Sequence, residues 1–356
     1  MQAGHWRVLG LMSGSSLDGL DMCLANFDFD SHRWHFSIES SHTQPYPDEL
    51  VDKLRVAHLA PVADVQMLDA RLGHFFAQAV DSFLAGKTKP QLISSHGHTI
   101  VHDPTAGFTL QIGGAAYLAA KTRLPVVSDF RTADVALGGQ GAPLVPFGDD
   151  LLFSSYAACL NLGGIANVSL RQGEQRLAWD MAFCNMVLNH FSQKLGHPYD
   201  EGGALAASGN YLPELNERLQ AWAYYHRLAP KSLGREDFER DLLPLLEMGS
   251  PTPRDVLRTY TQHLAQYLGT TLTARCPKGN VLVTGGGAFN SYLMQSMQQA
   301  TPLQLLVPDA EVVAQKEALI FAFLGLLRYL HQTNVYSSVT GSSADHSAGV
   351  ILDLFP

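Results

Sequence analysis

The chain has 356 residues, 46% of them hydrophobic, which is long enough for two globular domains that each bury a core. Its formal net charge of -9 argues against the basic surface that nucleic acid or an anionic membrane selects, so small-molecule partners are favoured. Four widely scattered cysteines without a CxxC pair argue against a disulfide framework or a structural zinc site. The first residues resemble no leader peptide and the longest apolar run, 318–327, is too short for a bilayer, so we expect a cytoplasmic protein.

The first motif is GLMSGSSLDGLD, residues 10–21, which lies between short β-type runs at 6–9 and 22–27. Its glycines and serines offer backbone amides and hydroxyls to an anion, which makes it a candidate phosphate turn. Asp18 and Asp21 would reach a phosphate only through magnesium or its waters. A plain hairpin turn is the alternative interpretation.

Further elements follow in order: a strand at 34–40, helices at 48–60 and 62–84, and a strand at 91–93 that runs into SSHGHTIVHDP. His96 and His98 could share a metal, as in metal-dependent hydrolases, but a loop histidine more often hydrogen-bonds a ligand or a neighbour.

Strand-like and helical pieces continue at 109–113, 115–122 and 125–129, the last ending in DFR. Arg131 closely follows that strand end, where ligands bind in α/β proteins, although a surface salt bridge explains it equally well. The next stretch, ALGGQGAPLVP, is typical of a hinge, and we place the domain boundary near it.

The opening pattern then recurs as strand 157–160, the glycine turn NLGGIAN, and strand 168–170. Two such units suggest duplicated lobes that face one phosphate chain across a cleft. A strand at 177–179 ends at Asp180. A carboxylate at this place suits a general base. Alternatively, Asp180 caps the helix predicted at 186–196. Asn185 could cap that helix equally well.

The remaining signals are helical. A capping box at Thr252 begins one helix, and a strand at 281–284 runs into GGGAFN and a helix, which favours a nucleotide. The helix at 312–330 is apolar on nearly all sides, so we expect it to be buried. Glu317 lies near the start of this helix. It either stabilises the first turn through the helix dipole or faces the cleft and hydrogen-bonds a substrate hydroxyl.

Nine motifs match one family in order and nearly end to end: GLMSGSSLDGLD, SHGHTIVHDP, TLQIG, VVSDFRTADVALGGQGAPLVP, NLGGIANVS, PKSLGREDF, VTGGGAFN, KEALIFAFLG and SSVTGS. The chain resembles the anhydro-N-acetylmuramic acid kinases. The resemblance implies an α/β fold with two lobes of related actin-like ATPase topology, mixed β-sheets flanked by helices, around a central nucleotide cleft. It also implies ATP and Mg²⁺, a cytoplasmic homodimer and a role in peptidoglycan recycling, whereas the acidic net charge is what argues against a nucleic acid or membrane partner.

The resemblance assigns roles to residues. Asp180 would be the catalytic base that activates a water, and Asp18 would lie near magnesium, directly or through water. The nucleotide-binding set would be Gly14, Ser15, Ser16, Leu17, Asp18, Gly19, Asp21, Asn161, Gly163, Gly164, Gly285, Gly286, Gly287 and Asn290. The sugar-binding set would be His96, Gln111, Arg131, Asn185 and Glu317. We place the N-terminal lobe at 1–135, rejoined by about 332–356, and the C-terminal lobe at 136–331, and we expect an open cleft without ligand.

The chain departs from the family pattern in three places. Ser15 replaces threonine, Gly114 replaces aspartate, and DMAFCN at 180–185 replaces DTGPGN. Asp180 and Asn185 are the same as in the family pattern, whereas the four residues between them differ. These departures leave open a kinase for another anhydro or ordinary sugar, such as levoglucosan, and less strongly a sugar-binding sensor without catalysis.

Overall fold

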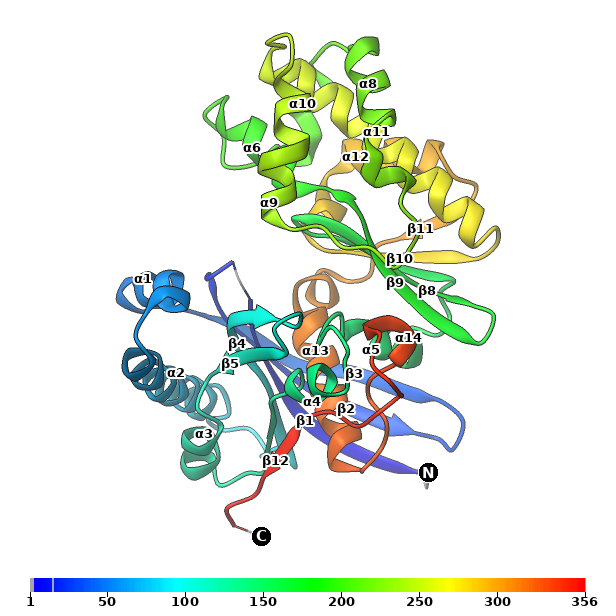
Figure 1. The fold of residues 1–356 in the computed structure, drawn as a ribbon. Helices are drawn as coiled ribbons and strands as arrows, with labels where there is room; N and C mark the ends of the chain where they lie inside the picture. Colours follow the sequence, from blue (N-terminus) through cyan, green and yellow to red (C-terminus); the bar gives the residue numbers. More distant parts are fainter. Residues whose placement is uncertain (1–2, 15, 356) are drawn as a thin grey trace. The chain divides into compact units, whose positions relative to one another are not determined.

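The computed structural model describes residues 3–14 and 16–355, and Figure 1 shows their course. The chain divides into two compact units, which we call the N/C unit (Met1–Leu152 with Gln315–Pro356) and the middle unit (Phe153–Ala314). These boundaries differ from the expected 1–135 and 332–356. Helix α5 (Val145–Leu152) and most of α13 (Ala310–Tyr329) belong to the N/C unit, where a Cβ on Gly148 would lie 2.6 Å from Ile320.

One mixed sheet forms the centre of the N/C unit. Its strand order is β12-β6-β4-β1-β2-β3, and β5 pairs with β4 outside this path. The three N-terminal strands form an antiparallel meander, whereas β4 and β6 are parallel to β1. The strand bounds are β1 Gly4–Ser13, β2 Gly19–Phe29, β3 Trp34–Pro45, β4 Leu92–Asp103, β5 Phe108–Ile112, β6 Val126–Ser128 and β12 Val350–Leu352.

Helices cover both faces of this sheet because its strands are apolar on both sides. Leu9 and Leu11 of β1 pack with α2 (Val62–Phe83) and α3 (Ala115–Thr122) in one cluster. The intervening Gly10 points to the opposite face. There α13 approaches so closely that a Cβ on Gly10 would lie 2.0 Å from the carbonyl oxygen of Ala318. Smaller helices of this unit are α1 Asp48–Val56, α4 Thr132–Ala136 and α14 Ser337–Thr340.

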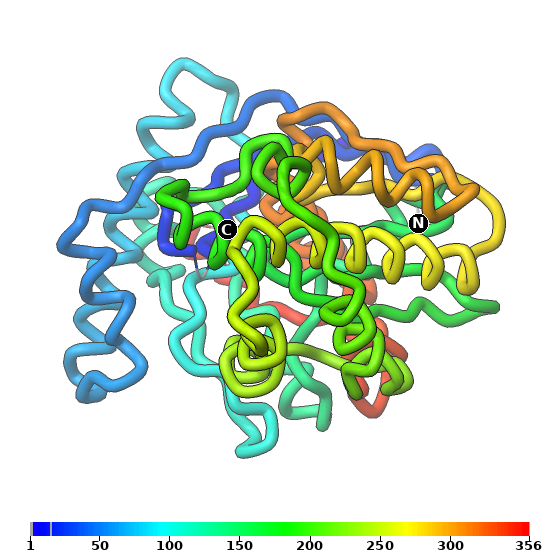
Figure 2. Tube along the Cα trace, turned by 90° about the horizontal axis from the view of Figure 1, so that it is seen from above, coloured from blue at the N-terminus to red at the C-terminus, as the bar shows by residue number. Residues whose placement is uncertain are grey.

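The middle unit contains the second mixed sheet, of order β11-β10-β7-β8-β9. Helices α11 and α12 run side by side beside it, as both views show (Figure 1 and Figure 2). The strands are β7 Ala158–Leu162, β8 Ile165–Gln172, β9 Gln175–Phe183, β10 Asn280–Thr284 and β11 Gln304–Leu306. The helices are α6 Asn185–Gln193, α7 Ala204–Ala207, α8 Pro213–Gln220, α9 Arg235–Asp237, α10 Leu243–Glu247, α11 Pro253–Arg275 and α12 Ser291–Gln299.

The two sheets share one connectivity. In each, an antiparallel meander of three strands is followed by a parallel strand beside the first strand of the meander, and then by another parallel strand outside it. The glycine turns predicted near the start of each half therefore join corresponding strands, β1 to β2 and β7 to β8. This confirms two lobes of related α/β topology.

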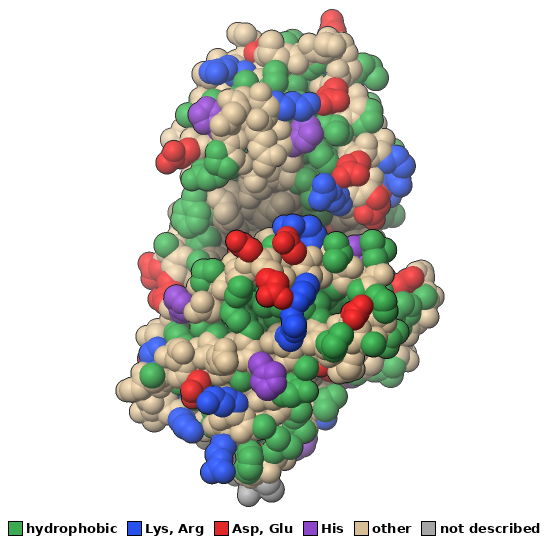
Figure 3. Space-filling model, turned by 90° about the vertical axis from the view of Figure 1, so that its left-hand side faces the viewer, with side chains coloured by type: hydrophobic (Ala, Val, Ile, Leu, Met, Phe, Trp, Pro, Cys, Tyr) green, Lys and Arg blue, Asp and Glu red, His purple; other side chains and the backbone are tan. Residues whose placement is uncertain are grey.

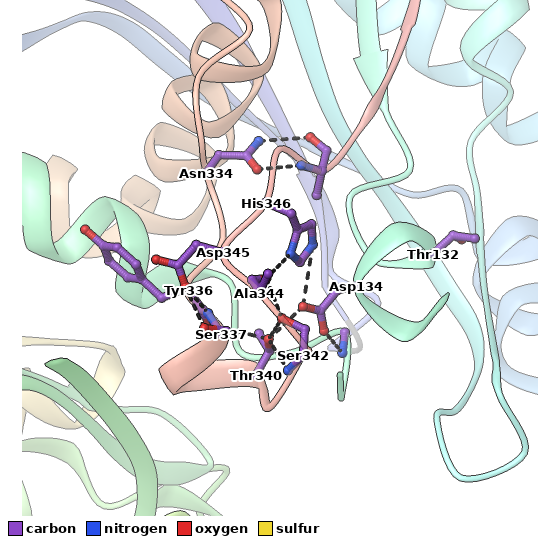
Figure 4. A network of polar contacts seen from close by, with 12 residues as sticks. Thr132, Asp134, Asn334, Tyr336, Ser337, Thr340, Ser342, Ala344, Asp345 and His346 are labelled. Atoms are coloured by element: carbon purple, nitrogen blue, oxygen red, sulfur yellow. Dashed lines mark hydrogen bonds and ion pairs between the residues drawn. The ribbon is translucent and has the colours of Figure 1, made fainter. Parts of the chain in front are cut away.

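The stretch ALGGQGAPLVP, expected as a hinge, lies inside the N/C unit and is held by hydrogen bonds (Figure 4). The fully buried carboxylate of Asp134 accepts the Gly141 N–H at 2.6 Å and the Thr340 hydroxyl at 2.6 Å. The Gln140 N–H donates to the carbonyl of Thr340 at 2.8 Å. A buried carboxylate needs such partners, so this segment is fixed to the C-terminal part of the chain.

Acidic and basic side chains are interspersed on the face shown in Figure 3. Within residues 3–14 and 16–355, no helix is both long and apolar enough to cross a bilayer.

Candidate active site

The β1–β2 turn begins with a buried polar cluster. Tyr46 donates its hydroxyl hydrogen to Ser13 Oγ at 2.5 Å, and Ser13 Oγ lies 2.8 Å from His98 Nδ1. Ser13 Oγ thus accepts from Tyr46 and shares a second hydrogen bond with His98 Nδ1. The turn closes by a hydrogen bond from the Leu17 N–H to the Gly14 carbonyl at 3.3 Å. Ser15, predicted to bind nucleotide, lies outside the described residues.

Two carboxylates follow this turn. Asp18 is exposed and accepts a hydrogen bond from Ser16 Oγ at 2.7 Å, while Asp21 is half-buried and accepts from Thr43 Oγ1 at 2.5 Å. Burial raises the pKa of Asp21 and the charge of Asp18 adds to this, although the Thr43 bond opposes it. Gly19, beside them, packs against the backbone of Gln44 and leaves no room for a side chain.

A magnesium ion fits this turn only together with a nucleotide. The described part of the chain holds no group of three or more His, Cys, Asp or Glu side chains that could bind a metal. Magnesium commonly takes one or two carboxylates and completes its shell with phosphate oxygens and waters. The exposed Asp18 carboxylate suits that arrangement.

The histidines expected in a loop lie on β4, which extends to Asp103. Arg131 Nε donates to His96 Nε2 at 3.0 Å, and His96 Nδ1 lies 2.9 Å from the Gly97 carbonyl, to which it donates. Burial, together with the Arg131 charge, lowers the pKa of His96 to about 3. His96 is therefore neutral and orients Arg131, and a metal shared with His98 finds no support here.

Arg131, Glu317 and Gln111 belong to the same unit. Glu317 is exposed, contrary to the expectation of a buried carboxylate, yet the surrounding protein still raises its pKa by desolvation and Asp21 adds to this. The charge of Arg131 opposes that shift. Gln111 donates to Thr109 Oγ1 at 2.8 Å, while its buried Oε1 has no hydrogen-bond partner among the described residues. A buried acceptor of this kind is available to a ligand hydroxyl.

The departure at Gly114 has a structural counterpart. Asp69 of α2 accepts the N–H groups of Gly113 and Gly114 at 2.8 and 2.9 Å. A Cβ on Gly114 would lie 2.7 Å from the Tyr117 ring, so an aspartate does not fit there without movement.

The glycine turns of the middle unit pack against one another. Gly285 has φ +81°, and a Cβ on it would lie 2.6 Å from Asn161 Oδ1. A Cβ on Gly287 would lie 2.7 Å from Leu162, whose carbonyl accepts the Asn185 side-chain amide at 3.0 Å. The structure therefore brings together the residues predicted at 161–164, 185 and 285–287.

Two neighbouring contacts complete this region. The Gly163 carbonyl accepts the Asn185 N–H at 3.0 Å, and the Gly164 carbonyl accepts the Cys184 N–H at 2.8 Å. Asn290 uses its side chain as the N-cap of α12, where it accepts the Leu293 N–H at 3.0 Å. Its side-chain oxygen thus has a structural role.

Asp180 lies inside β9 rather than at a strand tip, because the strand continues to Phe183. It does not cap α6 either, since Cys184 occupies the N-cap position of that helix. The carboxylate is half-buried, and Oδ2 accepts the Leu233 N–H at 2.9 Å. Burial raises the pKa of Asp180, and the Leu233 bond opposes this. Oδ1 has no hydrogen-bond partner among the described residues.

The segment that positions Asp180 was missed by sequence reasoning. The Asp180 N–H donates to the Lys231 carbonyl at 3.0 Å, and its carbonyl accepts the Tyr224 hydroxyl at 2.7 Å. Lys231 Nζ donates to the Tyr224 carbonyl at 2.9 Å, and burial together with nearby arginines lowers the pKa of Lys231 to about 8. The PKSLGREDF motif contains Lys231 and Leu233, and it is the sequence signal that could have located this segment.

Comparison with known proteins decides the family. The family model described as "Anhydro-N-acetylmuramic acid kinase" matches residues 6–353. The chain belongs to this family. A family protein of Shewanella frigidimarina is 36% identical over 94% of this chain and 95% of its own length. Those of Saccharophagus degradans and Chromobacterium violaceum are each 35% identical, over 96% of this chain and 98% of theirs.

Solved structures resemble the chain more distantly. A ROK family glucokinase from Streptomyces griseus has a TM-score of 0.38 at 13% identity, covering 89% of this chain and 98% of its own. The activator of the 2-hydroxyisocaproyl-CoA dehydratase from Clostridium difficile has a TM-score of 0.40 at 12% identity, covering 92% and 99%.

Proposed function

We propose that this chain is an ATP-dependent kinase that opens the 1,6-anhydro ring of anhydro-N-acetylmuramic acid by hydrolysis and phosphorylates the freed six-position oxygen. The product is N-acetylmuramate 6-phosphate. Family membership supports the reaction class, and one observation carries the mechanism. Asp180 has a carboxylate oxygen without a protein partner and a raised pKa, as a general base requires.

In this mechanism, Asp180 Oδ1 removes a proton from a water molecule that attacks the anomeric carbon. The bond from that carbon to the six-position oxygen breaks, and the oxygen takes the γ-phosphoryl group of ATP, leaving ADP. The proton passes from Asp180 to solvent after the products form. Lys231, Leu233 and Tyr224 hold the strand and the carboxylate in position.

The glycine turns are the proposed nucleotide contacts, because exposed backbone amides near glycine admit phosphate oxygens closely. Magnesium, when bound with ATP, would neutralise charge on the phosphates, and Asp18 is the residue proposed to hold it directly or through water. Asn161 and Gly285 shape the turn of the middle unit through their close packing.

The proposed sugar contacts are chemically varied. The Arg131 guanidinium, oriented by neutral His96, suits the lactyl carboxylate of the substrate. The unpaired Gln111 Oε1 suits a hydroxyl or amide N–H, and the exposed Glu317 carboxylate suits a sugar hydroxyl. Asn185 is proposed to contact the sugar from the middle unit.

The cellular setting is also a proposal. A phosphorylated amino sugar from peptidoglycan is a recycling product, so we place the enzyme in the cytoplasm, where ATP is available. We expect a homodimer, as the resemblance implied.

The deciding experiment combines the protein with ATP, Mg²⁺ and the anhydro sugar and analyses the product by mass spectrometry. The expected product has the mass of the substrate plus one water and one phosphoryl group. Sugar and ATP that bind with ordinary affinity but give no phosphosugar, even at high protein concentration, would contradict a kinase and favour a binding protein.

The rival substrate is a smaller anhydro sugar such as levoglucosan. The rewritten turn at Met181–Cys184 is fully buried and completes β9 instead of exposing a loop. A sugar panel compared by kcat/KM decides between them, because a pocket built for lactyl and acetamido groups loses rate when they are missing. Comparable rates on levoglucosan would overturn the substrate assignment.

A further inference from the structure

The middle unit carries a groove that the proposed reaction does not use. It has a volume of about 730 Å³ and lies between α8, the short 3₁₀ helix Ala223–His226, α11 and α12. Ligand sites for small molecules typically measure about 300–1,000 Å³. Asp180 and the glycine turns contribute no residue to this groove, because its lining residues come from 211–226, 262–271 and 296–300.

The lining of the groove is polar and contains no Asp, Glu, Lys or Arg. It therefore lacks the Lys and Arg side chains that usually neutralise a phosphate or a carboxylate. Side-chain amides dominate, each offering two donors and an acceptor. These amides are Asn216, Gln220, Gln262, Gln266 and Gln299.

Aromatic rings form another part of the lining. The rings of Tyr225 and Tyr267 lie 4.1 Å apart between centroids, and the Tyr225 ring lies 5.3 Å from that of His263. Tyrosine rings present an apolar face together with a polar hydroxyl, which suits ligands that have both C–H faces and hydroxyl groups. Neighbouring threonine hydroxyls at Thr270 and Thr271 add hydrogen-bonding capacity.

The imidazole of His263, in the groove lining, has a buried nitrogen without a hydrogen-bond partner among the described residues. His263 is only 6% exposed, and its Nδ1 donates to Asn216 Oδ1 at 3.0 Å. Its Nε2 is then an acceptor, and it has no hydrogen-bond partner among the described residues. Burial lowers the pKa of His263 to about 4, so the ring is neutral near pH 7. An unpaired buried acceptor is costly, which favours a ligand or water that donates to it.

From this lining we infer that the groove binds a neutral polyhydroxylated molecule of monosaccharide or disaccharide size. Hydroxyl groups match the side-chain amides as donors and acceptors, and the C–H faces of a sugar ring pack against tyrosine. A lining without Lys or Arg selects against nucleotides and sugar acids, because burying their charge without a counter-charge is costly. The site is thus separate in position and in chemistry from the one proposed for the anhydro sugar acid.

The test measures binding of uncharged sugars to the full chain by saturation-transfer NMR and titration. The panel is glucose, N-acetylglucosamine, cellobiose and chitobiose, with glucuronate as the charged comparison. At least one neutral sugar is expected to bind saturably, with a Kd on the order of 1 mM, and more tightly than glucuronate. Gln266→Leu should weaken this binding at least about tenfold, the cost of losing hydrogen bonds to a ligand.

The matched control is Gln295→Leu, because Gln295 is an exposed glutamine of α12 that does not line the groove. It should bind the sugar as the parent chain does. Gln299→Leu, also exposed, repeats the test on a second helix should Gln266→Leu fail to fold. Equal binding by groove and control variants, or no saturable binding of any neutral sugar, overturns the inference. So does a dimer, seen by sedimentation, that Gln266→Leu dissociates, since a second copy would then occupy the groove.

Discussion

The β1–β2 turn and the β7–β8 turn occupy equivalent places in two sheets of the same connectivity, yet their chemistry differs. The first turn is followed by carboxylates, Asp18 and Asp21, and tolerates extra atoms. A Cβ on Gly14 would meet nothing closer than Ser16 Oγ at 3.5 Å. The second turn is packed against the turn that follows β10, where a Cβ on Gly285 would lie 2.6 Å from Asn161 and 2.7 Å from Leu162.

The difference teaches that glycine serves two purposes in one topology. In the N/C unit, Gly14 leaves space in the turn that precedes the acidic groups, which suits a phosphate accompanied by a cation. In the middle unit, glycine lets three backbone segments approach one another, which fixes the turn before any ligand arrives. The catalytic carboxylate is proposed for the middle unit, on β9.

The largest expected effect follows from replacing Asp180, the proposed base in the middle unit. Asp180→Asn keeps the size of the side chain and its acceptor for the Leu233 N–H, but it cannot take a proton from water. We expect a loss of at least ~100-fold in kcat with little change in ATP affinity. Phosphosugar formation and nucleotide titration measure the two quantities.

Glu236→Gln is the matched control, because Glu236 is an exposed carboxylate in the segment that positions Asp180. It should retain nearly full kcat. An Asp180→Asn protein that keeps more than about a tenth of the parent kcat would refute the assignment of the base, and Glu317 would be the next candidate.

Alanine substitutions at Gly14 of the first turn and at Gly285, which packs against the second turn, sharpen the comparison. Gly285→Ala places a Cβ against Asn161 and strains a backbone with φ +81°, so it should lower the free energy of unfolding by about 2–4 kcal/mol. Gly14→Ala should change it by less than about 1 kcal/mol, because the space beside Gly14 is open. Urea denaturation measures both. Equal destabilisation by the two substitutions would show that the surroundings of Gly14 and Gly285 do not differ in packing.

The pH dependence of stability gives a smaller effect. The pKa of Asp180 in the folded state is raised above 3.8, its ordinary value, so the folded protein favours the protonated carboxyl group. This contribution to the free energy of unfolding is fully present below the unfolded-state pKa. It is lost as the pH rises through the folded-state pKa. At pH 7 the charged carboxylate therefore costs stability, and Asp180→Asn should unfold at higher urea than the parent chain. The difference in urea midpoint between Asp180→Asn and the parent chain should disappear as the pH falls below the folded-state pKa of Asp180. A variant less stable than the parent at pH 7 would contradict the raised pKa.

The same shift acts on activity in the opposite sense. The base must be deprotonated, so kcat/KM should rise with pH through a limb whose midpoint lies above 3.8. A pH profile of phosphosugar formation locates the limb. A midpoint at or below 3.8 would remove Asp180 from consideration as its source.

The smallest expected effect is an absence of titration in the N/C unit. His96 accepts from Arg131 and has a pKa of about 3, so its ring signals should stay constant from pH 5 to 8. An unperturbed histidine titrates near 6.5. NMR of the ring protons, assigned with His96→Gln, checks this. Titration near neutral pH would mean that His96 is not the neutral partner of Arg131.

Much of the fold could be predicted, because the spacing of hydrophobic residues and the residue types found in turns and helix caps are local signals in the sequence. The helix expected at 115–122 matches α3, and the Thr252 cap begins α11 as expected. Strand ends were harder, since hydrogen bonds to neighbouring strands decide them. β4 continues through the histidines, and β9 continues past Asp180.

The candidate site shows the same division. Glycine turns are visible in sequence, but the partners of Asp180 come from residues more than 40 positions away along the chain. The exposure of Glu317 was also not predictable, because an apolar helix pattern does not reveal which single residue lacks a covering neighbour.

The discontinuity of the N/C unit has a consequence for synthesis on the ribosome. Its first 152 residues are made before the middle unit, whereas α13 and β12 come after residue 309. At about 5–20 residues/s, the 162 residues of the middle unit take roughly 10–30 s to translate. Through that interval, the face of the first sheet around Gly10 and Ser94 lacks the helix that covers it. The nascent chain must therefore carry an uncovered apolar surface, to which chaperones bind, until α13 emerges.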